Sequence, residues 1–292
     1  MESNCQQIAA EISEIQKLKA GFDMALHLNE LDKARAIQSD LENKIAIFYE
    51  QVVPLEFREL IKKESEVIEG FFGKHIDVPP LPKSITLEKF KYWESIGFEL
   101  HYLPKEEMTP DKDFPGWINK PEYFFEQVQR KRITKDSSLL NGEWVLVDGR
   151  PKPDGEVTVG EYSNDSLGET LVVLRKVGAI QKDEHRPLFS RYLVSCNELN
   201  SDALKTAFAE LLRANSQDVC LPRAIEWNYL GNAFHPEWGE TSSREWFQDN
   251  FKNGHHLYGG SSILGGLSNV YHYSPVFRGN DLGFRLMVRF PK

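Results

Sequence analysis

The sequence has little cysteine and no long apolar run. Its three cysteines (Cys5, Cys196 and Cys220) are odd in number and widely spaced. They therefore predict neither a disulfide framework nor a zinc motif. No window approaches the roughly 18 consecutive apolar residues that a membrane helix needs. The N-terminal residues, MESNCQQIAAEISEIQ, lack the apolar core of a signal peptide. We expect a cytoplasmic protein that makes no contact with a membrane.

The sequence also lacks an excess of positive charge: 44 acidic residues outnumber 35 Lys and Arg, and the formal net charge at pH 7 is −9. Binding to a nucleic-acid backbone needs a concentrated basic surface, so we expect no nucleic-acid partner. The sequence has no P-loop, no dinucleotide-binding fingerprint and no GxSxG nucleophile motif. The 18 Phe, 10 Tyr and 6 Trp can fill a core and still leave aromatic side chains for a binding surface.

The first part of the chain has helical periodicity. Apolar residues recur at steps of three and four from Ile8 to Phe22 and again from Leu31 to Val52. The break between these runs contains Asn29, a candidate N-cap. The pattern predicts two antiparallel helices and, after Pro54, a third. This region carries no catalytic pattern, and it can pack on the rest of the chain or pair with itself in a homo-oligomer.

The proline-rich stretch DVPPLPKS (Asp77 to Ser84) marks a boundary. After it, we expect helices over TLEKFKYWESIG and KPEYFFEQVQRKR, then short strands at Trp144–Val147, Leu171–Leu174 and Arg191–Ser195. The segment NSDALKTAFAELLRAN predicts a helix capped by Ser201 or Asp202. GFRLMVRF, near the end of the sequence, predicts a strand.

Four blocks of the second half resemble one known family. CLPRAIEWNYLGNA, SSREWFQDNF, YGGSS with NDLGFRLM, and YLVSCNELNSDALKTAFAELL are similar to successive blocks of the sulfatase-modifying-factor, or formylglycine-generating-enzyme-like, domains. The resemblance covers residues 141–292. It implies an α+β, C-type-lectin-like fold. We therefore expect an N-terminal helical region over 1–76, a mixed connecting region over 77–140 packed on the last domain, and the C-type-lectin-fold domain over 141–292.

The catalytic members of this family use cysteines between the GGS-like and GFRL-like blocks to bind copper. Here that segment, Gly259 to Leu286, contains no cysteine. Cys196 and Cys220 lie upstream and are interpreted as small buried side chains. A related iron-dependent branch draws histidines from an N-terminal bundle, and His27, His75 and His101 have no ligand-like spacing. We expect no catalytic residue, no metal ligand and no cofactor.

The segment from Gly259 to Asp281 is the candidate binding surface. Its mixture of Tyr, Ser, Gly and Asn is typical of antibody paratopes, in which Tyr supplies rigid area and the small polar residues supply adaptable hydrogen bonds. His255 and His256 are adjacent, so on a strand they point to opposite faces and make a poor metal chelate. The predicted ligand-binding residues are Ser262, Ile263, Leu264, Ser268, Asn269, Tyr271, His272, Tyr273, Ser274, Phe277, Arg278 and Asn280.

The layout is similar to that of retroelement-diversified variable proteins, a non-catalytic branch with C-type-lectin folds that bind ligands through this segment. The leading hypothesis is a non-catalytic binder of a protein or a small ligand. One alternative is a formylglycine-generating or related metal-dependent oxidative enzyme. A second alternative is a structural or scaffold protein.

Overall fold

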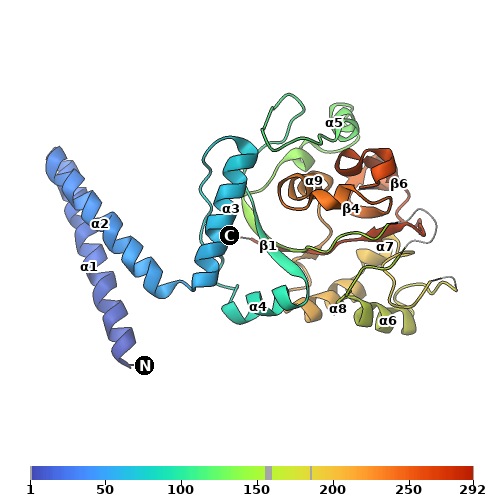
Figure 1. Ribbon diagram of the computed structural model, residues 1–292, viewed down its shortest axis with the longest axis horizontal. Helices are drawn as coiled ribbons and strands as arrows, with labels where there is room; N and C mark the ends of the chain where they lie inside the picture. Colours follow the sequence, from blue (N-terminus) through green and yellow to red (C-terminus); the bar gives the residue numbers. More distant parts are fainter. Residues whose placement is uncertain (1, 155–159, 185, 292) are drawn as a thin grey trace. The chain divides into compact units, whose positions relative to one another are not determined.

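The computed structural model describes residues 2–154, 160–184 and 186–291, and shows an α+β protein with two four-stranded sheets (Figure 1). The chain divides into two compact units, Met1–Leu60 and Ile61–Lys292. This division falls inside the third helix, whereas the sequence prediction placed boundaries at residues 76 and 140. Within the described residues, no helix is both long enough and apolar enough to cross a membrane.

The first unit is a helical hairpin. Helix α1 (Glu2–His27) and helix α2 (Leu31–Val52) lie side by side, and the unit ends in the first turns of α3 (Leu55–Phe72) (Figure 1). Lys44 of α2 pairs with Glu14 of α1 at 2.7 Å. The prediction of Asn29 as an N-cap is wrong. Asn29 has a φ of 59° in the left-handed region, and Glu30 occupies the N-cap position.

The first sheet has the strand order β1-β2-β8-β3, and all its pairs are antiparallel. The predicted strand at Trp144–Val147 is confirmed, but sequence reasoning missed the strand that pairs with it, Phe98–Leu103. The strands are β1 (Phe98–Leu103), β2 (Glu143–Asp148), β3 (Val219–Cys220) and β8 (Met287–Phe290).

The second sheet has the order β6-β5-β4-β7. Its β4–β7 pair is parallel and its other pairs are antiparallel, with a register shift in β4 between Trp246 and Asn250. The strands are β4 (Arg244–Phe251), β5 (His255–Gly259), β6 (Val270–Tyr273) and β7 (Leu282–Phe284). The single strand predicted for GFRLMVRF is therefore two strands, β7 and β8, which belong to different sheets.

The helices of the second unit mostly begin at good local signals. Thr86 accepts a hydrogen bond from the Lys89 backbone N–H and caps α4, and Ser201 does the same for Leu204 and α8, as predicted. The helices are α4 (Leu87–Ser95), α5 (Glu122–Gln129), α6 (Gly168–Lys176), α7 (Cys196–Leu199), α8 (Asp202–Leu212) and α9 (Ala224–Ala233). The 3-10 turns are η1 (Lys135–Ser138), η2 (Pro236–Gly239), η3 (Lys252–Gly254), η4 (Ser262–Leu264) and η5 (Gly266–Ser268).

Two predicted strands are wrong. Leu171–Leu174 lies within α6, and Arg191–Ser195 is an irregular segment in which Leu193 has a φ of 58°. Its backbone is held by contacts outside any sheet: the Leu193 N–H donates to the Gly279 carbonyl, and the buried Arg191 pairs with Asp148 and Asp165. A buried ion pair of this kind stabilises an irregular backbone only where both charges are satisfied.

A second buried ion pair joins the two sheets. Arg285, between β7 and β8, donates two hydrogen bonds to Glu245 of β4, at 3.1 and 3.0 Å. The same guanidinium donates to the carbonyls of Asp148 and Arg150 after β2. Tyr162 and Trp227 each donate a hydrogen bond to one of the two Glu245 oxygens, so each oxygen accepts hydrogen bonds from two donors. The site described next is built on this rigid connection.

Candidate functional site

The candidate segment begins at a buried glycine pair. Gly259 is the last residue of β5, where a Cβ would overlap the backbone oxygen of Asn269. Gly260 has a φ of 96°, and its N–H donates to the same oxygen at 3.1 Å. Only glycine fits this combination of left-handed backbone and close approach. The start of the segment is therefore fixed by backbone packing.

The other end of the segment is equally buried. Leu282, Gly283 and Phe284 form β7 beside β4, and Arg285 follows in its ion pair with Glu245. The segment thus leaves the core at Ser261 and returns to it at Leu282, with both attachment points buried. Between these points most side chains face solvent, and Leu267, Asn269 and Val270 are the buried exceptions among the non-glycine residues.

The twelve predicted ligand-binding residues are mostly accessible. Six are exposed: Ser262, Ile263, Leu264, Tyr271, Tyr273 and Asn280. Five are half-buried: Ser268, His272, Ser274, Phe277 and Arg278. The last, Asn269, is a correction to the predicted set, because it is buried and its Oδ1 accepts a hydrogen bond from the Ser261 backbone N–H at 3.1 Å. It supports the segment and presents nothing to a ligand.

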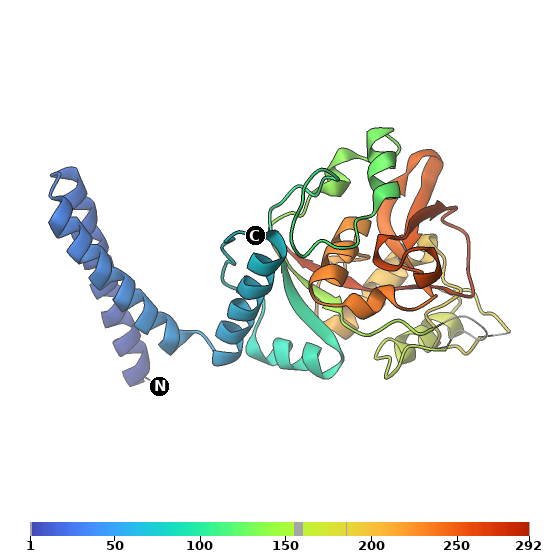
Figure 2. The same cartoon turned by 45° about the horizontal axis from the view of Figure 1, so that its top comes forward.

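An aromatic row lies on one face of the second sheet. Tyr258 of β5 is directly opposite Tyr271 of β6, so both side chains share a face, and Tyr273 lies two residues further along it. The Phe277 ring packs against the Tyr273 ring in a tilted arrangement, with centroids 4.2 Å apart, and the Tyr123 ring of α5 lies 5.3 Å from the Tyr271 ring. Helix α5 and strand β6 are side by side in both views (Figures 1 and 2). We call these five residues the tyrosine face.

A charged pair borders the tyrosine face. The Arg244 guanidinium lies 5.1 Å from the Tyr258 ring centroid and pairs with Asp281 at 2.6 Å. Cations over tyrosine rings stabilise both the ring position and the guanidinium. Beyond the row, Ile263 and Leu264 of η4 are 67% and 52% exposed, and Val276 is 62% exposed. The accessible surface is thus aromatic and aliphatic with a polar border.

Two predicted residues are directed elsewhere. His272 lies on the opposite face of β6, stacked on Phe251 with ring centroids 3.7 Å apart, and its Nδ1 is 3.0 Å from Nδ1 of His255. Arg278 is held by Glu198, at 3.1 and 2.8 Å. These contacts connect the segment to α7 and to the core side of the sheet.

One buried leucine anchors the middle of the segment. Leu267 of η5 inserts between two glycines, Gly231 of α9 and Gly239 of η2, each of which lacks the Cβ that would overlap it. The Leu267 carbonyl accepts a hydrogen bond from the Asn228 side chain at 2.7 Å. The exposed turns on either side are therefore held at fixed positions on α9.

The two described cysteines are poor nucleophiles or metal ligands. Cys196 is buried and Cys220 is partly buried, and neither forms a disulfide. Burial raises the pKa of Cys196 to about 12 and that of Cys220 to about 11. Both remain protonated thiols near neutral pH, whereas the thiolate is the reactive and metal-binding form.

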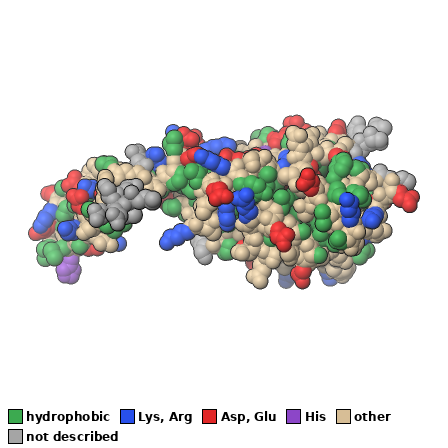
Figure 3. All heavy atoms as spheres, turned by 90° about the horizontal axis from the view of Figure 1, so that it is seen from below, with side chains coloured by type: hydrophobic (Ala, Val, Ile, Leu, Met, Phe, Trp, Pro, Cys, Tyr) green, Lys and Arg blue, Asp and Glu red, His purple; other side chains and the backbone are tan. Residues whose placement is uncertain are grey.

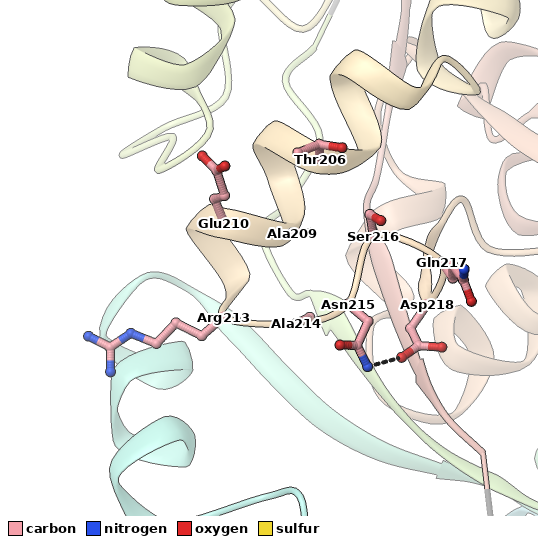
Figure 4. A pocket seen from close by; sticks show the side chains of 9 residues that line it. All are labelled: Thr206, Ala209, Glu210, Arg213, Ala214, Asn215, Ser216, Gln217 and Asp218. Carbon is pink, nitrogen blue, oxygen red and sulfur yellow. Dashed lines mark hydrogen bonds between the residues drawn. The ribbon is translucent and has the colours of Figure 1, made fainter.

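Two surface hollows are lined by residues outside the candidate segment. One, of about 620 Å³, lies between α8 and the loop before β3, where the side chains of Glu210 and Arg213 point away from Ser216 and Gln217 (Figure 4). The other, of about 780 Å³, is lined by residues 128–135 and 250–252. Neither is lined by any of the twelve predicted residues. On the face shown in Figure 3, basic and acidic side chains are interspersed, without a broad basic area.

A histidine–carboxylate cluster, which sequence reasoning missed, lies elsewhere in the second unit. Glu99 and His101 project from β1, and His235 lies between α9 and η2. Glu99 Oε2 is 3.5 Å from His101 Nε2 and 3.6 Å from His235 Nε2. The other ring nitrogens face two further carboxylates: His101 Nδ1 is 3.0 Å from Glu64, and His235 Nδ1 is 3.0 Å from Glu237. We call Glu99, His101 and His235 the histidine cluster.

The two histidines of the cluster titrate in opposite directions. Burial opposes a charge on His101, but the carboxylate of Glu64 and the contact with Glu99 outweigh it and raise the pKa of His101 to about 9. Burial and the neighbouring charge of His101 lower the pKa of His235 to about 4. Contact with His101 also lowers the pKa of Glu99. Near neutral pH, His235 is therefore a neutral imidazole facing an ionised carboxylate.

The missed residues left different signals in the sequence. Glu99 and His101 are two residues apart, a spacing that places both on one face of a strand, so assigning β1 would have paired them. Tyr258 directly precedes the glycine block at 259–260, and pairing its strand with the strand at 270–273 would have placed it opposite Tyr271. Tyr123 and His235 lie far from their partners in sequence, and only the tertiary fold brings them there.

Comparison with known proteins returns no match to the chain, whether against family models, curated protein sequences or solved structures.

Proposed function

We propose that this protein is a non-catalytic binder that presents the tyrosine face and the neighbouring η4 turn to a protein partner. The observation that carries the proposal is the contrast between a buried frame and an accessible insert. Gly259, Gly260 and Leu282–Arg285 are buried, whereas eleven of the twelve predicted side chains between them are exposed or half-buried. An insert held this way is suited to recognition, because its exposed side chains are not needed for the core.

The chemistry of the insert favours a macromolecule as the ligand. Tyr271 and Tyr273 are 43% and 46% exposed, and Ile263, Leu264 and Val276 are more exposed still. Accessible aromatic and aliphatic groups with a polar border are typical of the centre of protein interfaces. Tyr combines a large contact area with a small loss of side-chain freedom on binding. A protein partner therefore suits this surface better than a small molecule does.

The finer proposal is a C-type-lectin-type domain belonging to a retroelement-diversified variable protein. It rests on the four sequence blocks, and the positions of the GGS-like and GFRL-like blocks at the two ends of the insert support it. The DNA around the gene tests it directly. We expect a near-copy of the last ~100 bases of the coding sequence next to a reverse-transcriptase gene, and a genomic neighbourhood without either would contradict this version.

The binding proposal is tested by a matched pair of triple variants. Tyr271, Tyr273 and Phe277 are changed to alanine in one variant; the control changes Val173, Val177 and Phe189, three exposed apolar residues outside the insert. Partners are selected with the wild-type protein and their affinities are measured by titration. We expect binding to be lost in the first variant and kept in the control, with both variants folded by circular dichroism. Equal binding by both variants would refute the proposal.

The enzymatic alternative receives little support from the cysteines. Formylglycine-type chemistry needs accessible thiolates, and Cys196 and Cys220 lie outside the insert with raised pKa values. The scaffold alternative differs from the binding proposal in one measurable respect, because a scaffold would assemble normally after the triple substitution in the insert and would have no partner sensitive to it.

Helices α1 and α2 are proposed as an oligomerisation element. Several apolar side chains on this hairpin are exposed: Ile12, Met24, Leu26, Leu28, Leu31, Ile45, Ile47 and Val52. Exposed apolar residues in this number commonly mark an interaction surface. A homo-oligomer would present several tyrosine faces at once, and linked binding sites gain apparent affinity without any new contact.

A further inference from the structure

We propose that the histidine cluster, Glu99, His101 and His235, binds one divalent transition-metal ion. The two imidazole nitrogens and the carboxylate oxygen converge on one point from two separate parts of the second unit. Their ligand atoms all lie within 4.8 Å of one another. The site is independent of the tyrosine face, so its test and the test of the proposed function have separate outcomes.

The separations fit a metal better than they fit a direct hydrogen bond. Glu99 Oε2 lies 3.5 Å from His101 Nε2 and 3.6 Å from His235 Nε2. Both separations are long for a charge-assisted hydrogen bond, which is typically about 2.7–2.9 Å. Two ligands bound tetrahedrally to zinc at about 2.0–2.2 Å are about 3.3–3.6 Å apart. Both separations from Glu99 therefore match those between two ligands of one zinc ion, and the third separation in the cluster is within 4.8 Å.

Both nitrogens that face the cluster centre lack protein partners. His101 is 1% exposed and His235 is 7% exposed, and neither Nε2 atom has a hydrogen-bond partner among the described residues. A buried nitrogen without a partner costs free energy, so its presence calls for a ligand. If His235 donates from Nδ1 to Glu237, its Nε2 lone pair faces the Glu99 carboxylate. A cation between these two electron-rich atoms would turn their repulsion into attraction.

The groups behind the histidines resemble the outer shell of a metal site. Nδ1 of His101 faces Glu64, which is fully buried, and Nδ1 of His235 faces Glu237. Metal-binding histidines characteristically donate their second ring N–H to a carboxylate, which fixes the tautomer and directs the free nitrogen to the metal. Here both histidines have such a partner, and each Nε2 is directed to the same point.

Charge and space also favour an ion. Three carboxylates (Glu64, Glu99 and Glu237) surround the two histidines, and the nearby Arg285 is neutralised by Glu245. Glu99 packs against Gly149, where a Cβ would overlap the carboxylate, so this glycine leaves room for the ligand. The Glu99 side chain is 44% exposed and provides a route from solvent.

The ligand set defines the class of ion. Two imidazoles and one carboxylate suit Zn²⁺ or Fe²⁺, whereas Ca²⁺ and Mg²⁺ prefer oxygen ligands alone. An ion here would link β1 to the segment between α9 and η2, which are distant in sequence. We therefore expect metal binding to stabilise the folded second unit by binding only the native arrangement.

The test uses the full chain after treatment with a chelator. Zn²⁺ and, under anaerobic conditions, Fe²⁺ are titrated by calorimetry into the wild type and into Glu99→Gln, His235→Ala and Gly149→Ala. The control is His75→Ala, a surface histidine that also lies beside two carboxylates, Glu69 and Asp77. Glu99→Gln is the decisive variant, because it removes the carboxylate charge and keeps the size of a side chain that is 44% exposed. Circular dichroism in chelator verifies the fold of each variant.

We expect one equivalent of metal to bind the wild type and the His75→Ala control with equal affinity. Loss of an outer-shell partner typically lowers metal affinity by about 10–100-fold, so loss of a ligand in Glu99→Gln or His235→Ala should lower it by at least that much. The thermal midpoint should rise with metal in the wild type and the control alone. Absence of stoichiometric binding of either ion, or equal binding by Glu99→Gln and wild type, would overturn the proposal.

Discussion

Replacing Gly231 with alanine should have opposite effects depending on the side chain at position 267. Gly231 lies inside α9, and the Cβ that alanine adds would overlap Leu267 Cδ2 and come within 3.3 Å of Cδ1. Leu267 has little room to move, because a Cβ at Gly239 would lie 2.8 Å from its Cγ on another side. The substitution therefore overpacks a closed contact and does not fill an empty space.

The expected free-energy changes follow from two opposing effects. Alanine in place of glycine inside a helix stabilises by about 1 kcal/mol. Overpacking a well-filled core costs about 1–3 kcal/mol. In the wild-type background, Gly231→Ala should therefore be neutral to destabilising by about 2 kcal/mol. In a Leu267→Ala background the overlap is absent, and the same change should stabilise by up to about 1 kcal/mol.

Urea denaturation of the four proteins in this double-mutant cycle measures the difference. Leu267→Ala alone should cost about 2–5 kcal/mol, as expected for a buried leucine. The coupling between the two positions should be about 1–3 kcal/mol. An identical effect of Gly231→Ala in both backgrounds would show that Leu267 does not occupy the space beside α9. In that case the insert would lack the anchor on which the proposed binding surface depends.

Two other predictions concern charge and assembly. Burial opposes ionisation of Glu226, but Arg289 and Arg223 outweigh it and lower the pKa of Glu226 to about 2 from its ordinary 4.5. The ionised Glu226 carboxylate therefore stabilises the fold fully above about pH 4.5, and this stabilisation is lost as the pH falls through about 2. Between pH 6 and pH 3, the free energy of unfolding in urea should fall by about 2 kcal/mol more in the wild type than in Glu226→Gln. Parallel pH profiles of the two proteins would contradict this. Ile45 and Val52 are exposed on one face of α2, and we expect this face to form the contact between copies of the chain. Light scattering should detect an oligomer in the wild type and in the control Ile118→Glu. The double variant Ile45→Glu, Val52→Glu should be a monomer. A monomeric wild type would remove the proposed role of the hairpin.

Local signals explain which elements the sequence could predict. Helix α8 has an apolar stripe and a strong start signal at Ser201, and its position was predicted closely. The strand β2 is a run of buried residues bounded by a turn, which is also a local pattern. Where residue propensity, hydrophobic periodicity and end signals all favour the same element, tertiary contacts do not change it.

The two wrong strands lack that agreement. The run LVVL at 171–174 is short and rich in β-branched residues, and such runs do not distinguish a strand from a helix. In α6, Leu171 and Leu174 are buried whereas Val173 is 58% exposed, so the helix buries only one face of that run. The segment 191–195 is buried for a different reason, because Arg191 must reach Asp148 and Asp165. A buried arginine within an apolar run cannot be anticipated from the pattern of hydrophobic residues.

The sequence indicated the bounds of the insert but not which of its side chains are exposed. Composition indicated the insert, and the glycine block at 259–260 indicated one of its ends. The sequence did not indicate which face of β6 meets solvent, so His272 and Asn269 were grouped with Tyr271. The histidine cluster depends on the pairing of β1 with β2 and on the turn after α9, and neither contact is encoded locally.

The position of β8 has a consequence for how the second unit folds. Strand β8 lies between β2 and β3 in the first sheet, and its Phe290 pairs with Trp144. Until residues 287–290 are available, β2 has one unpaired edge and β3 has no neighbour. Contacts between residues so distant in sequence form slowly, because the intervening chain must be ordered first. During synthesis, the second unit therefore remains incomplete until β8 has left the ribosome, and the exposed edge of β2 is where a nascent chain would most readily associate with another.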